Sequence, residues 1–177
     1  MPSTTSTFDL ASNLSIDSVL LESIVNGARE GLAMTGLTPP AVGAGKLCQS
    51  TRPISVIVGL VGKSNGTLTL NMSERAMLLL ASRLLMEEQT ETSEDVYDAI
   101  SEVGNMVAGC VKELLANSEY ELRNISVPSV ILGMNYNVYY TRGVHTLSVD
   151  FELEDLAGTV QSDRFFSVTV SLLRQIA

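Results

Sequence analysis

The chain has 177 residues, of which 45% are hydrophobic, and its formal net charge is −9. Its 11 Lys and Arg residues are scattered, which argues against a nucleic-acid-binding protein. Polar residues interrupt each apolar run before it reaches the roughly 20 residues that a membrane-spanning helix needs, and one histidine with two cysteines offers no set of metal ligands. The N-terminus lacks a basic start followed by an apolar block, so we expect a cytoplasmic protein in which Cys48 and Cys110 are reduced thiols.

The N-terminal region divides into a tail and a helix. Residues 1–14 are rich in Ser and Thr and show no periodicity, which predicts a disordered tail before a single domain at 15–177. A helical pattern runs from Ile16 to about Thr35, with Asp17 as a suitable N-cap.

A β-hairpin and a second helix follow after short extended segments. Residues 54–61 form a continuous β-branched run, and residues 67–72 alternate strictly between polar and apolar. The segment 63–66 between them contains the Asn-Gly pair that is typical of a hairpin turn. Ser73 is then expected to cap a helix that continues through Met86.

The second half repeats this order with a longer helix. A charged linker at 87–94 leads to a helix that begins at Ser93 or Asp95 and continues to about Asn117. Three extended segments are expected after it, at about 128–140, 144–153 and 165–173.

The order helix-then-strands therefore occurs twice, at about 16–86 and 95–177. An offset of 80 residues makes four pairs equivalent: Ser18 and Asp98, Glu22 and Glu102, Val25 and Asn105, Arg29 and Gly109. We expect an α/β (α+β) fold in which two long helices lie on one face of an antiparallel sheet, related by a pseudo-twofold axis. The first helix also carries a second apolar stripe, which predicts burial against the sheet and against another element or subunit; the stripe is Leu21, Val25, Ala28 and Leu32.

The long second-half helix carries four conspicuous residues on one face: Asp98, Glu102, Asn105 and Gly109. Its apolar residues lie on the opposite side, so the helix is amphipathic and this stripe faces solvent. A carboxylate beside a carboxamide can hold a cationic group and orient a water molecule. Gly109 is compatible either with close approach of a partner or with packing between helices, whereas Gly104 is expected to permit close packing of the helix on the sheet.

The pattern Asp98-x3-Glu102-x2-Asn105, followed after 22 residues by Pro128, resembles the signature of the CheC/CheX/FliY family of chemotaxis phosphatases. Pro128 would begin a strand. Because Val25 replaces the amide in the first repeat, the chain resembles the CheX type, in which one helix is active. The resemblance covers roughly residues 15–177 and implies a homodimer.

The resemblance implies a phosphatase that acts on the aspartyl phosphate of a CheY-like receiver protein. Asn105 would orient the attacking water, and Glu102 would pair with a Lys of the receiver. Asp98 and Gly109 would support docking, although an acidic residue early in a helix also stabilises the helix dipole. No cofactor of its own is implied, since Mg²⁺ would be held by the receiver. Two alternatives remain open, namely an adaptor that binds receivers without hydrolysis and a structural component of a signalling assembly.

Overall fold

The computed structural model describes residues 16–46, 51–134, 136, 142–156 and 160–173. The expected tail at 1–14 and Cys48 lie outside these residues. None of the helices in the described residues is both long enough and apolar enough to span a membrane.

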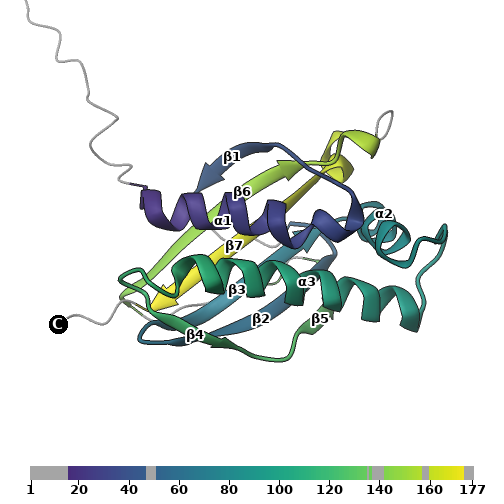
Figure 1. Ribbon diagram of the computed structural model, residues 1–177. Helices are drawn as coiled ribbons and strands as arrows, with labels where there is room; N and C mark the ends of the chain where they lie inside the picture. The colour runs from purple at the N-terminus through teal and green to yellow at the C-terminus, as the bar shows by residue number, and fades with distance from the viewer. Residues whose placement is uncertain (1–15, 47–50, 135, 137–141, 157–159, 174–177) are drawn as a thin grey trace, which may run out of the picture.

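The described part of the chain forms three α-helices, seven strands and three short 3₁₀ turns (Figure 1). In chain order these elements are α1 (Ser18–Gly31), η2 (Ala33–Thr35), β1 (Ala41–Gly45), β2 (Ile54–Gly62), β3 (Asn65–Met72), α2 (Glu74–Leu85), α3 (Glu94–Leu115), β4 (Leu122–Ile125), β5 (Ser129–Leu132), β6 (Val144–Glu152), η3 (Glu154–Leu156), η4 (Gln161–Arg164) and β7 (Phe165–Leu173).

The strands form one sheet whose pairings are all antiparallel, in the order β1-β6-β7-β3-β2-β4. The strand β5 pairs with β2 as well, beside the first residues of that strand. Helices α1 and α3 lie side by side across one face of the sheet (Figure 1). The predicted fold class is therefore confirmed.

The strand order is symmetric when each strand is exchanged for its counterpart in the other repeat, β1 for β5, β2 for β6 and β3 for β7, as expected for two repeats. The central pair is β3 with β7, one strand from each repeat, and Thr69 lies opposite Thr169 there. The outer strand of each repeat pairs with the other repeat's hairpin, because β1 joins β6 and β5 joins β2. The sheet is thus interleaved around a pseudo-twofold axis near its centre.

The helix starts agree with the sequence pattern. Asp17, Ser73 and Ser93 cap α1, α2 and α3, each accepting a hydrogen bond from the backbone N–H three residues later. Helix α1 packs on the sheet and also against α3, as expected for a helix buried on two sides, and Gly27 and Gly31 lie at its contact with α3. Glycine permits this approach, since a Cβ on Gly31 would lie 2.5 Å from the Cα of Val107.

The strands differ from the prediction in three places. The strands β1 and β4 were not predicted as such; β4 has only four residues, two of them exposed. The strand expected at 128–140 ends at Leu132, and most of the remainder lies outside the described residues. In the β2–β3 hairpin, Asn65 and Gly66 already belong to β3, and the side chain of Asn65 accepts a hydrogen bond from Gly62 N (3.2 Å) instead of forming the turn.

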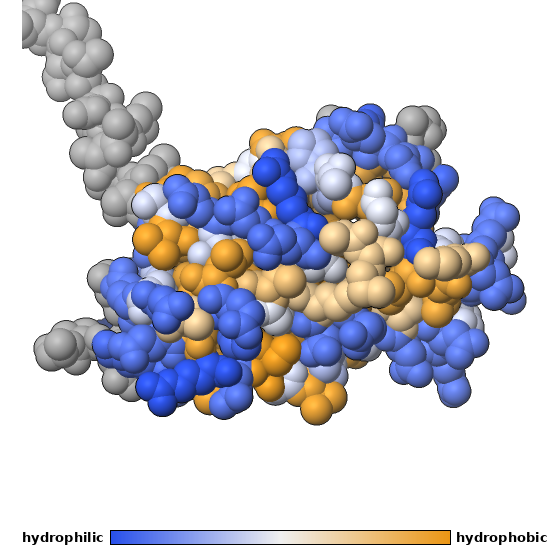
Figure 2. All heavy atoms as spheres, viewed as in Figure 1, coloured by the Kyte–Doolittle hydropathy of each residue, from blue (hydrophilic) through white to orange (hydrophobic). Residues whose placement is uncertain are grey.

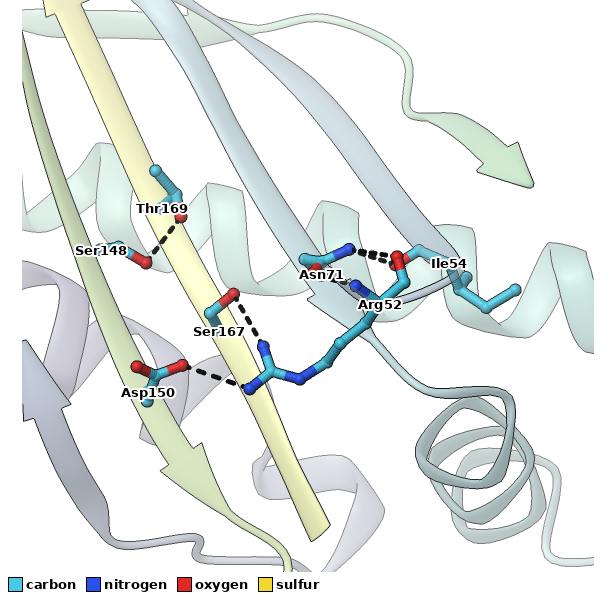
Figure 3. Close-up of polar contacts among 7 residues, drawn as sticks. All are labelled: Arg52, Ile54, Asn71, Ser148, Asp150, Ser167 and Thr169. Atoms are coloured by element: carbon cyan, nitrogen blue, oxygen red, sulfur yellow. Dashed lines mark hydrogen bonds and ion pairs between the residues drawn. The ribbon is translucent and has the colours of Figure 1, made fainter. Parts of the chain in front are cut away.

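The sheet face that points away from the helices is polar, although it is buried. Its buried residues are Ser55, Thr69, Asn71, Ser167, Thr169 and Ser171. They are joined across strands: Thr169 Oγ1 donates to Ser148 Oγ (2.9 Å), and Asn71 Nδ2 donates to the carbonyl of Ile54 (3.0 Å; Figure 3). Arg52 completes this network, with contacts to Ser167 and Asp150. The helix-covered face supplies the hydrophobic core.

Candidate functional site

The packing of helix α3 on the sheet determines which way the predicted stripe of Asp98, Glu102, Asn105 and Gly109 faces. Its apolar residues Val96, Ile100, Val103, Val107 and Val111 are fully buried. A Cβ on Gly104 would lie 2.5 Å from Val56 Cγ1 of β2, so this glycine lets the helix lie directly on the sheet, as predicted. The opposite side of α3 consequently faces away from the sheet.

The four predicted residues lie together on that outer side. Asp98 and Glu102 are exposed, whereas Asn105 and Gly109 are half-buried. The Asn105 Nδ2 donates to Glu102 Oε2 at 3.5 Å, a long and weak hydrogen bond. The carboxylate and the carboxamide are therefore adjacent, and both can still bind an incoming partner or a water molecule.

The first repeat does not form an equivalent site. Ser18 and Glu22 are exposed on α1, but Val25 stands at the amide position and packs against the core. In the described part of the chain, no group of three or more His, Cys, Asp or Glu residues could hold a metal ion. The candidate site is therefore centred on the carboxylate–amide pair of α3, Glu102 and Asn105.

Gly109 is not a packing position within this chain. A Cβ added to it would meet no heavy atom within 4 Å, whereas one on Gly27 would lie 2.4 Å from Val111 Cγ2. The predicted alternative of helix–helix packing therefore applies to Gly27 and Gly31 of α1, and not to Gly109.

An open groove lies beside Gly109, with a volume of about 560 Å³. Its lining comes from the end of α1, from η2, from α3 and from β4: Glu30, Gly31, Met34, Met106, Gly109, Cys110, Lys112, Glu113, Arg123, Asn124 and Ile125. Figure 2 shows a hydrophobic band along the seam between α1 and α3, with hydrophilic residues on both sides. Sequence reasoning missed this groove because four separate elements form it, one of which is the unpredicted β4.

The groove also contains Cys110, which the structure describes as a free thiol. Burial raises the pKa of this thiol, and the negative charges of Glu30 and Glu113 raise it further. The thiol is consequently held in its protonated form and behaves as a small apolar part of the groove wall.

Comparison with known proteins places these features in a family context. The family model described as chemotaxis phosphatase CheX matches residues 54–152, which include the whole of α3 and Pro128. No curated protein matches the chain.

Several solved structures share the fold. A CheX from Desulfovibrio desulfuricans is 20% identical (TM-score 0.72), with 86% of this chain and 98% of that chain covered. A CheC-like superfamily protein from Shewanella sp. PV-4 is 19% identical (TM-score 0.71; 89% and 99% covered). A CheX–CheY–BeF₃–Mg²⁺ complex from Borrelia burgdorferi contains a chain that is 25% identical (TM-score 0.69; 88% and 98% covered).

Proposed function

The chain belongs to the CheX family of chemotaxis phosphatases, and from this premise we propose that it hydrolyses the aspartyl phosphate of a CheY-like receiver protein. The observation that carries the proposal is the adjacent Glu102 and Asn105 on the exposed side of α3. The Borrelia burgdorferi relative is solved in complex with CheY, BeF₃ and Mg²⁺, which supports a receiver as the partner.

The chemistry of an acyl phosphate suits this small set of groups. An acyl phosphate is already reactive, so the main task is to place a water molecule in line with the phosphorus atom and to exclude bulk solvent. A carboxamide can donate to and accept from a water molecule, but it cannot act as a general base. Asn105 is accordingly proposed to orient the attacking water inside the receiver's active site.

The neighbouring carboxylates are proposed to hold the receiver. Glu102, one helical turn before Asn105, would pair with a lysine beside the phosphoryl group, because a charged hydrogen bond fixes both distance and direction. Asp98 lies a further turn away and would contribute to docking. Mg²⁺ belongs to the receiver in this proposal, and the chain itself supplies no cofactor.

The decisive experiment follows phosphate loss from a phosphorylated receiver of the same organism. Asn105→Ala should lower kcat/KM by about 100-fold or more, since it removes the water-orienting group. Glu102→Gln should mainly raise KM, because it keeps the shape and removes the charge. Asn26→Ala, an exposed amide on α1, is the matched control and should leave the rate unchanged.

Two outcomes would contradict the proposal. If Asn105→Ala hydrolyses as fast as the unchanged protein, the assignment of the amide fails. If the unchanged protein binds the receiver's BeF₃–Mg²⁺ form and never releases phosphate from the phosphorylated form, the protein is a receiver-binding adaptor.

We further propose that the protein is a cytoplasmic homodimer. The edge strand β5 and its flanks carry exposed apolar side chains: Val127 (85% exposed), Leu132 (55%) and Met134 (63%). Such an edge is available for pairing with a second copy. Sedimentation equilibrium tests this state, and a monomer at micromolar concentration would contradict it.

A further inference from the structure

Gly109 lies on the outer side of α3, in the last third of the helix. Glycine is the least favourable residue in a helix interior after proline. Among the residues that the structure describes, no neighbour requires a glycine here, since an added Cβ would meet no heavy atom within 4 Å. The missing side chain leaves a gap in the outer surface of α3, one turn beyond Asn105. We call this gap at Gly109 the notch.

The groove at this notch is lined by residues from both sides of α3. On one side it is bounded by Glu30 of α1 and Met34 of η2, and on the other by Arg123 and Ile125 of β4. Gly109 lies between these walls and belongs to both the groove and the stripe. A side chain at this position would block the passage from one wall to the other.

Two methionines make part of the groove lining apolar and adaptable. Met34 is 72% exposed, and the half-buried Met106 lies beside the notch. Methionine side chains are flexible and polarisable, which suits a surface that must receive a partner's side chain. Exposed apolar residues that gather in one concave place indicate a contact surface.

The two walls have opposite charges. Glu30 lies on the α1 wall, and among the described residues it has no ion-pair partner. Arg123 lies on the β4 wall, where its side chain is 75% exposed and its nearest carboxylate, on Glu121, is 3.8 Å away. A segment lying across the notch would therefore be matched by a basic group toward α1 and an acidic group toward β4.

We propose that the notch is a second docking point for the phosphorylated receiver, and that it determines which receiver is accepted. This inference rests on the proposed function, because the groove is continuous with the stripe through Gly109. The occupant is a receiver segment next to the phosphorylation pocket, with an apolar side chain over Gly109 and charges complementary to Glu30 and Arg123. Catalysis is left to Glu102 and Asn105, and the groove contributes affinity and selectivity.

The test combines variants that fill the notch with variants that alter its walls. Gly109→Leu fills the notch with a residue that favours helix, and Met34→Glu places a charge among the apolar lining residues. Each should raise the Kd for the BeF₃–Mg²⁺ form of the receiver, and the KM for its phosphorylated form, by at least tenfold, with kcat within about twofold. Val19→Glu, on the exposed start of α1, and Asn26→Leu are matched controls outside the groove.

A charge exchange tests the orientation of the partner. Arg123→Glu should weaken binding to the unchanged receiver, and reversing an acidic residue of the receiver to Lys should restore it. Restoration by one receiver position and not by its neighbours would identify the contact.

The outcomes separate this inference from the proposed function. If Asn105→Ala abolishes turnover while Gly109→Leu and Met34→Glu leave Kd and KM unchanged, the docking point is wrong and the phosphatase proposal stands. If the groove variants weaken binding while the unchanged protein shows no turnover, the docking point stands and the phosphatase proposal is wrong. Thermal melting of each variant confirms that lost binding is not lost folding.

Discussion

Thr69 of β3 lies directly opposite Thr169 of β7 at the centre of the sheet. The neighbouring pairs are Leu68 with Val170 and Leu70 with Val168, so an apolar pair flanks the threonine pair on either side. The two repeats meet along this junction, and its integrity decides whether they form one sheet.

Gly66 offers a sharp test of the junction. A Cβ at this position would lie 1.8 Å from the carbonyl oxygen of Ser171, so alanine must push β3 and β7 apart. We expect Gly66→Ala to lower the free energy of unfolding by about 3 kcal/mol, at the upper end of ordinary single substitutions. Urea unfolding measures this loss. Gly45→Ala in β1, where an added Cβ meets nothing within 4 Å, is the control, and equal stability of the two variants would contradict the close contact.

The helical glycines should respond to alanine in opposite directions. In Gly27→Ala the new Cβ would lie 2.9 Å from the backbone N of Val111, so α1 and α3 must separate at a cost of roughly 2 kcal/mol. In Gly109→Ala nothing is displaced, and the better helix propensity should add up to about 1 kcal/mol. Thermal melting distinguishes the two variants. A destabilised Gly109→Ala would show that this glycine does pack against its own chain.

Asp17 connects the start of α1 to the segment after α3. One carboxylate oxygen accepts from Leu20 N (2.9 Å), and the other accepts from the hydroxyl of Tyr120, which is 2% exposed. Asp17→Ala removes the helix cap and this acceptor, and should cost roughly 2–3 kcal/mol. Asp17→Asn retains a capping oxygen and should lose much less. Similar melting temperatures for Asp17→Ala and the unchanged protein would be incompatible with this bridge.

The ionisation of Glu121 should make a small contribution to the free energy of unfolding that depends on pH. The hydrogen bond from Lys63 (2.8 Å), followed by the charge of Lys63, lowers the pKa of Glu121 below its ordinary value of about 4.5. The ionised form is thus favoured on folding, so the stabilisation is present above the ordinary pKa and is lost as pH falls through the folded pKa.

NMR chemical shifts of the Glu121 carboxyl group, recorded as a function of pH, should give a titration midpoint below that of a glutamate in an unfolded peptide. Lys63→Met should return the midpoint toward the ordinary value, and so should high salt, because the pair is exposed. An unchanged midpoint in Lys63→Met would rule out Lys63 as the cause.

Sequence patterns predicted the features that depend on local chemistry. Ser93 and Asp17 were identified as helix starts because a short polar side chain can cap the first turn, and the stripe of α3 follows from helical periodicity alone. The strand β4 escaped prediction because two of its four residues are exposed and no alternation marks it. The Asn65-Gly66 signal located the hairpin correctly, yet pairing of Gly66 with Leu172 drew both residues into the strand.

The candidate site was predicted only as far as one helix could determine it. Asp98, Glu102, Asn105 and Gly109 share a face because they are spaced by helical turns. The groove needs the relative positions of α1, α3 and β4, which arise from packing contacts such as that between Gly31 and Val107. Periodicity within an element carries no information about such distant contacts.

The exchange of outer strands makes the two repeats mutually dependent. A fragment holding only α3 to β7 would keep Asn105, but β6 would lose its neighbour β1, and β7 and β5 would lose β3 and β2. The first repeat, in which Val25 stands at the amide position, therefore supplies strands that the second repeat needs to complete its sheet. We therefore expect that the chain cannot be shortened to the half that carries Asn105, because its strands would lack their partners.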